Sequence, residues 1–314
     1  MRRFFLTFLA LFALLTYFPT FEAETLPYFN PCNSLDGMTP DVPSSQNRRW
    51  TVSGSGDFKS FTIAPHNSTT RQDAYLWLPV IKFEYEHCYR FALDARTLYS
   101  NANGRFRIVM ATAPSRNNIV KELLPAEEVG TMFVPADCYF TPEETQELYL
   151  GIHVTSPGPA SNFYVDNLLV EEVPANVPTK VSDFKATSHK GGIKRVDLTM
   201  TAPGKNVLGG TTRSLSKIEL YSDGELIHTF TSPKPNSQQS FTYEGSGSGT
   251  HLFTARAFTS GGGAGAVAYV VGRVGSEIPA PDYNYDGRAF SYLATAIYQK
   301  DGDIHLSWRP RKLP

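Results

Sequence analysis

The chain has 314 residues and an almost balanced charge, with 29 lysines and arginines against 30 aspartates and glutamates. This balance excludes the basic surface that nucleic-acid binding requires, and it excludes a long acidic or basic tail. Hydrophobic residues make up 41% and aromatic residues 13%, so the chain can bury real cores. The 24 glycines, 22 prolines, 16 tyrosines and 21 phenylalanines favour short strands and turns over helical bundles.

Residues 1–23 have the pattern of a secretory signal peptide. Arg2 and Arg3 form a basic start, residues 4–18 are almost entirely apolar, and Glu24 opens a polar stretch. The apolar run is shorter than the roughly 20 residues that a membrane-spanning helix needs, and no later stretch approaches that length. We therefore expect cleavage before Glu24, a secreted or cell-surface location and no membrane span.

The first predicted domain, residues 24–174, alternates strand-like runs with breaks at Asn, Gly, Pro and Ser. In one run Tyr89 and Phe91 share a face while Arg90 takes the other, which is typical of a half-buried antiparallel strand. A helix of one or two turns is predicted only at residues 141–144, where Thr-Pro-Glu-Glu has capping-box spacing.

A second domain is predicted at residues 178–275, after a short proline-containing linker at 173–180. Asp223 and Gly224 lie between two apolar runs, which is a strong hairpin signal. The length and alternation predict a seven-stranded β-sandwich. Residues 276–314 carry the start of a further, partial β unit, from which we expect that the chain is a fragment of a longer protein or is truncated.

The second domain resembles a fibronectin type III domain. Met200 stands where that family usually has Trp, and Phe253 where it often has the corner Tyr, so the corner hydroxyl bond cannot form. The resemblance implies an immunoglobulin-like sandwich that acts as a spacer. The residues that carry it are a proline-led start and the runs at 198–203, 217–224 and 253–258.

The first domain resembles the jelly-roll adhesin modules of Bacteroidetes surface proteins, known as cleaved-adhesin or choice-of-anchor J domains and related to MAM domains. The resemblance implies an all-β fold, a jelly roll followed by the second sandwich, and a role in adhesion. Its matching runs, in chain order, are 26–29, 75–81, 89–91, 111–115, 149–153 and 163–168.

The three cysteines, Cys32, Cys88 and Cys138, allow one disulfide bond and one free thiol, or three free thiols. Their spacing fits neither a zinc site nor a CxxC motif. His87 is adjacent to Cys88, so the two point to opposite faces of a strand and do not form a catalytic pair.

No motif predicts an enzyme. The seven histidines contain no HExxH sequence and no pair at helical spacing, which argues against a zinc hydrolase. The glycine-rich residues 263–268 imitate a dinucleotide fingerprint, but a β-rich run follows them and not a helix. We therefore expect a non-catalytic protein.

Calcium is the one metal that we expect. In related jelly rolls the N-terminal loop and the last strand meet, so Asn33, Asp36 and Asp166 are the predicted oxygen ligands of a structural Ca²⁺. The alternative is that Asp36 caps a turn and Asp166 accepts backbone hydrogen bonds.

For ligand binding, exposed aromatic rings are the relevant residues because sugar rings stack on them. Tyr75 and Trp77 share one strand face, and they are predicted either to face solvent or a cleft, or to lie in the core. Arg90, Arg105 and Arg107 are predicted to line a polar face near them, with ordinary solvated strand positions as the alternative.

Together these features predict a secreted, non-catalytic binding protein that recognises an extracellular glycan or a host protein. The alternative is an accessory region of a secreted protease or glycan hydrolase whose catalytic domain lies elsewhere.

Overall fold

The structure is a computed structural model that describes residues 23–44, 49–56, 58–64, 72–98, 104–156, 162–189 and 192–275, and the backbone of 292–298 and 304–309. Residues 1–22 of the predicted signal peptide lie outside the described residues, as do the remaining residues of the partial unit at 276–314. In the described part nearly all regular structure is β-strand, and no helix there is long and apolar enough to cross a membrane.

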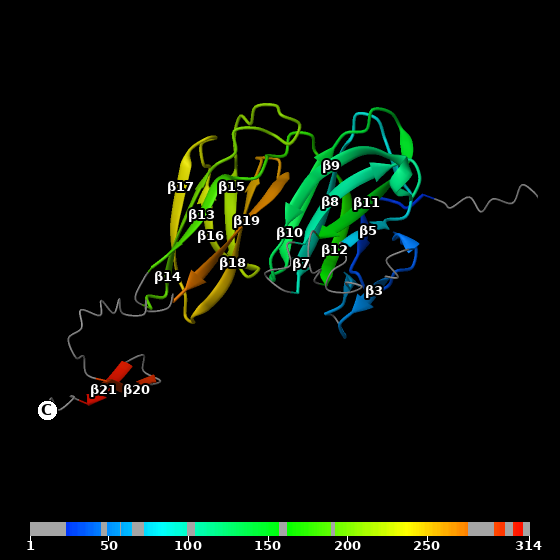
Figure 1. Cartoon of the computed structure of the whole chain (residues 1–314). Coiled ribbons are helices and arrows are strands. Elements are labelled where there is room, and N and C mark those ends of the chain that lie inside the picture. Colours follow the sequence, from blue (N-terminus) through cyan, green and yellow to red (C-terminus); the bar gives the residue numbers. More distant parts are fainter. Residues whose placement is uncertain are drawn as a thin grey trace, which may run out of the picture.

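The first sandwich consists of two antiparallel sheets, coloured blue to green in Figure 1. One sheet has the order β10-β7-β12-β4-β3, with β1 paired to β12, and the other has the order β2-β5-β11-β8-β9, with β6 paired to β11. The strands are β1 (Tyr28–Asn30), β2 (Thr39–Asp41), β3 (Trp50–Ser53), β4 (Ser60–Ile63), β5 (Gln72–Trp77), β6 (Ile81–Phe83), β7 (Cys88–Thr97), β8 (Arg105–Ala111), β9 (Ile119–Glu128), β10 (Val134–Phe140), β11 (Gln146–Ser156) and β12 (Phe163–Val173).

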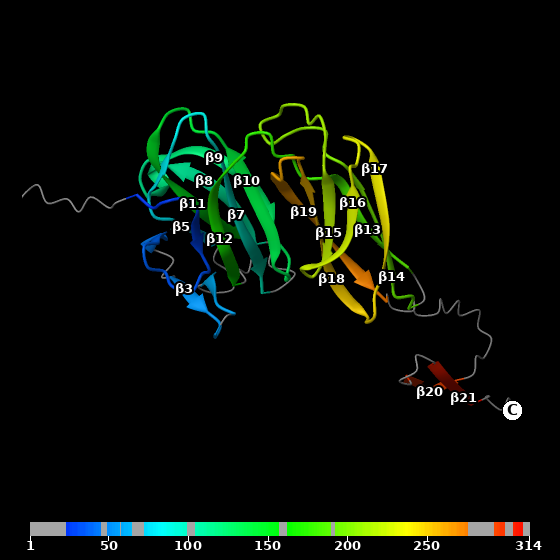
Figure 2. The same ribbon diagram turned by 180° about the vertical axis from the view of Figure 1, so that it is seen from behind.

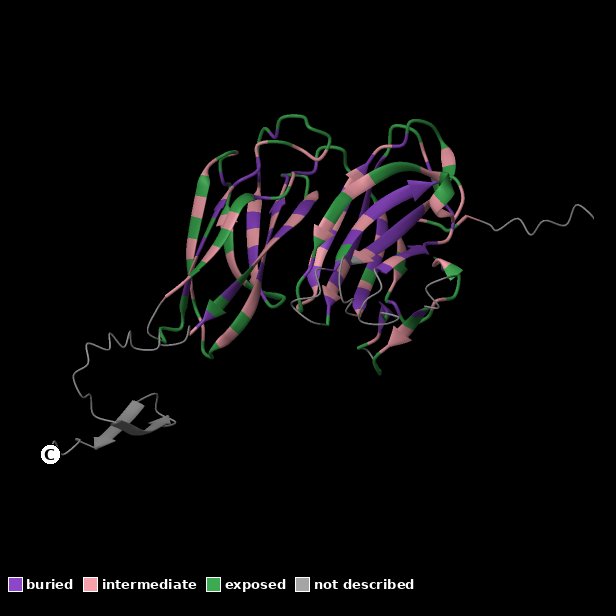
Figure 3. Ribbon diagram, in the orientation of Figure 1, coloured by how far each residue is buried: buried purple, intermediate pink, exposed green. Residues whose placement is uncertain are grey.

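The core of this sandwich comes from the inward residues of alternating strands. Phe61, Leu76, Phe91, Phe106 and Phe163 are all fully buried there, and Figure 3 shows the buried positions along the facing strands. Each such side chain contributes roughly 1.5–3 kcal/mol of transfer free energy. Because side chains alternate between faces along a strand, the same strands present their other residues on the outer faces.

The second sandwich has a three-stranded sheet, β13-β14-β17, and a four-stranded sheet, β16-β15-β18-β19. The predicted seven-stranded sandwich is therefore confirmed. Met200 and Phe253 are both buried in its core. The strands are β13 (Ser182–Ser188), β14 (Arg195–Thr201), β15 (Lys217–Ser222), β16 (Glu225–Thr231), β17 (Gln238–Glu244), β18 (Gly249–Phe258) and β19 (Ala264–Val274).

The two sandwiches meet where β10 of the first lies beside β19 of the second, as both views show (Figures 1 and 2). The connection between them is held by backbone hydrogen bonds. Val207 N donates to Val177 O over 3.0 Å, Thr179 N to Lys205 O over 2.9 Å, and Ala266 N to Pro178 O over 3.1 Å. Residues 177–179 of the linker are therefore attached to the segment at 205–207 and to β19 of the second sandwich.

The predicted helix at residues 141–144 is wrong, because residues 141–142 have no regular structure and residues 143–145 form bends. Strand β11 begins at Gln146 and pairs with β5, β6 and β8. Too few residues remain before it to nucleate a helix. In the partial unit, β20 (Tyr292–Tyr298) and β21 (Ile304–Arg309) pair in antiparallel fashion.

The predicted hairpin between β15 and β16 is confirmed, and it depends on one glycine. Asp223 and Gly224 have φ angles of 50° and 87°, as a two-residue type I′ turn requires. Gly224→Ala should lower the free energy of unfolding of the second sandwich by about 1–2 kcal/mol, because an L side chain is strained at that φ.

Urea unfolding followed by NMR signals of β18 measures this change. Gly247→Ala is the matched control, since a Cβ atom there would have nothing within 4 Å and its φ is not positive. Equal unfolding free energies for the two variants would contradict the assignment of the turn.

Candidate functional site

The two aromatic residues predicted to bind ligand lie on β5, and both are buried. Their rings stack with centroids 5.5 Å apart on the outer face of the sheet, where Val109 and Ala111 pack against them. Tyr75 is 5% exposed and Trp77 is 0% exposed. The expectation that Tyr75 and Trp77 face solvent or a cleft is therefore wrong. Trp77 is buried, as the alternative expected, but in a small cluster on the outer face and not in the core between the two sheets.

A glycine explains why the indole ring lies so flat on the sheet. Gly151 of β11 is the register partner of Trp77, and a Cβ atom at Gly151 would come within 2.5 Å of the ring. Ile119 and Tyr149 pack over the same cluster. Because Gly151 has no side chain, the Trp77 ring lies directly on β11. Ile119 and Tyr149 then shield the ring from solvent.

Polar side chains surround the buried tyrosine. His153 stacks on Tyr75 with centroids 3.9 Å apart. Arg107 Nε donates to His153 Nδ1 over 2.8 Å, and Arg107 Nη2 donates to the Tyr75 hydroxyl over 3.2 Å. Because Nδ1 accepts this hydrogen bond, the proton of the neutral ring is on Nε2, which lies 2.7 Å from Asp73 Oδ1. The predicted proximity of Arg107 to Tyr75 is therefore confirmed.

Access to Tyr75 is closed by the turn that contains Arg116, a residue for which the sequence analysis made no prediction. The Arg116 guanidinium lies 5.1 Å from the Tyr75 ring centroid. It is held by Asp41 at 2.9 Å and by Asp73 at 3.0 Å. The arrangement is an ordered polar cover over an aromatic cluster and leaves no open platform at this face.

The other two predicted arginines do not join this cluster. Arg105 of β8 makes an exposed ion pair of 3.5 Å with Glu128. Arg90 lies on β7, which belongs to the other sheet, so the prediction that it lines the same face as Tyr75 and Trp77 is wrong. The sequence could not show this, because the sheet to which a strand belongs depends on pairings distant in sequence.

Arg90 instead forms a buried charge cluster on the outer face of its own sheet. Its Nε lies 3.1 Å from Asp137 and its Nη1 lies 2.9 Å from Glu171. Burial opposes the charge of the guanidinium, but the carboxylates of Asp137 and Glu171 outweigh it and raise the Arg90 pKa above its ordinary value. Tyr139 donates its hydroxyl to the same Asp137 oxygen over 3.2 Å.

The cluster also connects the two sandwiches. The backbone N–H of Val267, on β19, donates to Asp137 Oδ2 over 3.3 Å. The Asp137 side chain is 5% exposed and that of Arg90 is 10% exposed, so water reaches neither group freely. One carboxylate of the first sandwich is thus shared by three donors, one of which belongs to the second.

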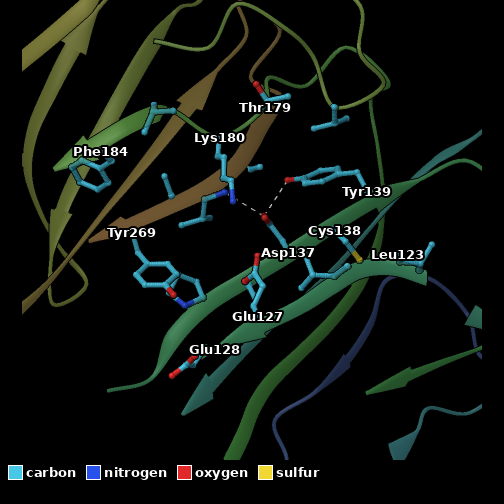
Figure 4. Close-up of a pocket in the computed structure, with 18 residues that line it drawn as sticks. Leu123, Glu127, Glu128, Asp137, Cys138, Tyr139, Thr179, Lys180, Phe184 and Tyr269 are labelled. Atoms are coloured by element: carbon cyan, nitrogen blue, oxygen red, sulfur yellow. Dashed lines mark hydrogen bonds between the residues drawn. The ribbon is translucent and has the colours of Figure 1, made fainter. Parts of the chain in front are cut away.

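Around this connection lies a hollow of about 760 Å³, which we call the interdomain groove. β9 and β10 supply one side of it, and the linker, β13 and β19 supply the other. Figure 4 shows Tyr139 and Tyr269 on opposite sides of Asp137. Among the residues that line the groove are Glu127, Asp137, Tyr139, Lys180, Phe184 and Tyr269.

Both tyrosines combine a ring surface with a hydroxyl that stays protonated. Burial, and then Asp137, raises the pKa of Tyr139 above its ordinary value. Burial, and then Glu127, does the same for Tyr269. A protonated hydroxyl donates and accepts hydrogen bonds, and the ring offers an apolar surface for stacking. The groove can therefore bind an uncharged ligand that carries both hydroxyl groups and C–H faces.

No prediction from the sequence included this groove. Alternation along residues 137–139 places Asp137 and Tyr139 on one face and Cys138 on the other, which was a usable signal of an outward polar pair. Nothing local indicated that Tyr269 would lie beside them.

Two of the predicted metal ligands, Asp36 and Asp166, accept hydrogen bonds from groups close in sequence. Asp36 accepts the Ser34 hydroxyl over 2.6 Å, and Asp166 accepts the backbone N–H of Asn167 over 2.8 Å. Asn33 is exposed. In the described part of the chain no group of three or more His, Cys, Asp or Glu side chains is placed to hold a metal. Calcium binding at Asn33, Asp36 and Asp166 stays a prediction.

All three cysteines are within the described residues, and each is free and buried. The possible disulfide bond is therefore not formed. Burial, and then the charge of Asp166, raises the pKa of Cys32 to about 12, and burial raises that of Cys138 further. Both sulfurs are thiols at neutral pH and act as small core side chains.

No protein-family model matches the chain, and no curated protein matches its sequence. Among solved structures, the K1 cleaved adhesin domain of Lys-gingipain from Porphyromonas gingivalis W83 is 11% identical, with a TM-score of 0.38, over 47% of this chain and 98% of that one. The CBM22-1 xylan-binding domain of Xyn10C from Paenibacillus barcinonensis is 9% identical, with a TM-score of 0.35, over 48% and 96%.

The glycoside hydrolase domain of Endo-D from Streptococcus pneumoniae R6 is 12% identical, with a TM-score of 0.31, over 77% of this chain. The alignment spans only 37% of that structure. The Bacteroidetes origin and the choice-of-anchor J assignment stay predictions, as does the fibronectin type III assignment.

The environment of His153 predicts a pH dependence of stability. Burial lowers its pKa, an effect that the Arg107 and Arg116 charges increase and Asp73 opposes. In the unfolded chain His153 therefore binds a proton near pH 6.5, whereas in the folded chain its ring is still neutral at that pH. As pH falls from 7 through 6.5 and below, the free energy of unfolding should decrease on account of this residue, by at most about 1.4 kcal/mol per pH unit.

Urea unfolding monitored by tryptophan fluorescence between pH 5 and 7.5 measures the slope. In His153→Gln the slope should be smaller than in the wild type, whereas His228→Gln, in the second sandwich, should leave it unchanged. The same slope in His153→Gln and the wild type would show that His153 is not buried in its neutral form.

Proposed function

We propose that this protein is a secreted or cell-surface, non-catalytic binding protein that holds an extracellular glycan or protein ligand in the interdomain groove. The observation that carries the proposal is the groove itself. Its volume of about 760 Å³ lies within the range of roughly 300–1,000 Å³ that ligand sites occupy. Tyr139 and Tyr269 supply aromatic surface, and a small number of polar groups supply hydrogen bonds.

The hydrogen bonds at the groove support a binding role over a catalytic one. A carboxylate that acts as a general acid, base or nucleophile must be free to exchange a proton or attack a substrate atom. Asp137 is occupied by donors from Arg90, Tyr139 and Val267. Glu127 and Glu128 are neighbours on one strand, so their side chains point to opposite faces and do not form a facing pair.

The attachment of the second sandwich supports a groove that is formed before the ligand arrives. Leu252 and Tyr269 of the second sandwich pack against the core of the first. Together with the bonded linker, this contact positions the two walls of the groove. A preformed site avoids part of the ordering cost of association, so modest contacts suffice for useful affinity.

Substitution of Tyr269 tests this proposal. We expect Tyr269→Ala to weaken binding about tenfold, or about 1.4 kcal/mol, because it removes one wall of the groove and one hydroxyl. The measurement is binding of the full chain to printed arrays of glycans and of extracellular glycoproteins, followed by calorimetry on the ligands found.

Tyr85→Ala is the control, because Tyr85 is an exposed tyrosine that does not line the groove. It should bind as the wild type does. If no ligand is found, or if a folded Tyr269→Ala binds with undiminished affinity, the groove is not the binding site.

A further inference from the structure

A second hollow lies on the outer face of the first sandwich and continues from the interdomain groove. It has a volume of about 210 Å³ and is walled by the ring of Phe29, so we call it the Phe29 hollow. Three consecutive residues of β10, at positions 135–137, line both hollows. The two are therefore neighbours that meet across one strand.

The strand register explains the shape of the Phe29 hollow. Asp137 of β10 is opposite Ala92 of β7, Ala92 is opposite Leu169 of β12, and Leu169 is opposite Phe29 of β1. Residues directly opposite each other share a face, so these four form one row across four strands. Ala92 has the smallest side chain of the row, and the depression lies where it sits between the larger groups.

The row spans three strand spacings, or about 14 Å, from Asp137 to Phe29. At the far end of the row Phe29 is 57% exposed, so a ligand can stack on its ring. Tyr139 and Tyr269 lie at the near end, in the groove. Aromatic surface is thus present at both ends of a continuous path, with a shallow floor between them.

The polar side chains along the path can form hydrogen bonds with the hydroxyl groups of a ligand. The Asn167 amide donates to Asp94 over 2.8 Å at the edge of the Phe29 hollow, and both residues keep further hydrogen-bonding positions. Burial raises the pKa of Asp94, while the hydrogen bond from Asn167 and the charge of Arg90 oppose the rise. Planar polar side chains beside an exposed ring are the pairing that recognises a sugar, whose C–H face stacks while its hydroxyls bond.

We propose that the ligand of this protein is a linear, neutral glycan that lies across both hollows, with one end against Tyr139 and Tyr269 and the other against Phe29. The proposal rests on the proposed function of the interdomain groove and specifies the ligand class and its path.

The direction of the path argues for a glycan over a peptide. A chain along the row from Asp137 to Phe29 crosses the strands, and β7 and β12 have their backbone groups paired within the sheet. An extended peptide gains most of its affinity by running along a strand edge, whereas this path crosses the strands and does not follow the edge of β10 or of β1. A glycan is recognised by side chains, so it loses no affinity when it lies across the strands.

The charges along the path argue for a neutral chain. Four carboxylates line the two hollows, those of Asp94, Glu127, Glu128 and Asp137, against the two cations Lys180 and Arg90. The Arg90 guanidinium is already paired with Asp137 and Glu171. Sulfated or uronic chains would therefore meet net repulsion. A cationic peptide would find Asp137 and Glu171 already neutralised.

Isothermal titration calorimetry of the full chain with linear oligosaccharides tests the proposal. The probes are the hexasaccharides and disaccharides of the xylan, cellulose, laminarin and mannan series. For at least one series the hexasaccharide should bind at least tenfold more tightly than the disaccharide. Phe29→Ala should abolish this gain with length and leave disaccharide binding unchanged, whereas Tyr269→Ala should weaken both.

Two further variants make the experiment decisive. Phe58→Ala removes a phenylalanine that is 88% exposed and lines neither hollow, and it should bind as the wild type does. Ala92→Gln fills the floor of the row without removing an aromatic ring. Like Phe29→Ala, it should abolish the gain in affinity from disaccharide to hexasaccharide.

The outcomes separate this inference from the function on which it rests. If binding depends on Tyr269 but the gain with length survives both Phe29→Ala and Ala92→Gln, the path across the sheet is wrong and the groove remains the site. If the groove binds a protein or peptide in a Tyr269-dependent manner and no oligosaccharide, the ligand class is wrong. If no binding depends on Tyr269, the proposed function itself fails.

Discussion

A buried carboxylate, that of Asp137, joins the two sandwiches, in addition to the packing of Leu252 and Tyr269 and the bonded linker. A buried carboxylate must be paired, and leaving it or its partner unpaired costs several kcal/mol. Asp137 Oδ2 satisfies this requirement with Arg90 at 3.1 Å, Tyr139 at 3.2 Å and the backbone N–H of Val267 at 3.3 Å. Because the last donor belongs to β19, the charge of the first sandwich is fully satisfied only when the second is docked.

Docking in turn creates the interdomain groove, whereas the Phe29 hollow is formed by the first sandwich alone. The interdomain groove exists because β19 stands beside β10, and Tyr269 reaches the first sandwich from that strand. The Phe29 hollow adjoins it because Pro135, Ala136 and Asp137 line both spaces. By contrast, the aromatic cluster of Tyr75 and Trp77 lies on the other sheet and is closed by polar side chains, so it stabilises the fold.

Local patterns in the sequence were enough for the strands but not for the site. Alternation correctly placed Tyr89 and Phe91 inside, and Asp223 and Gly224 correctly predicted a hairpin, because each signal is contained within a few residues. The burial of Trp77 depends on Gly151, and the position of Arg90 depends on sheet membership. These contacts join residues far apart in sequence, as does the contact of Asp137 with Val267, so no local pattern reveals them.

The rotational correlation time of each sandwich, obtained from backbone ¹⁵N relaxation of the full chain, reports whether the two sandwiches are fixed relative to each other. If the Asp137 cluster fixes the two sandwiches, their amides should report one common correlation time, and Asp137→Asn should give two shorter and different values. Separate correlation times in the wild-type protein, or a common value that Asp137→Asn leaves unchanged, would contradict the claim that this carboxylate holds the groove in place.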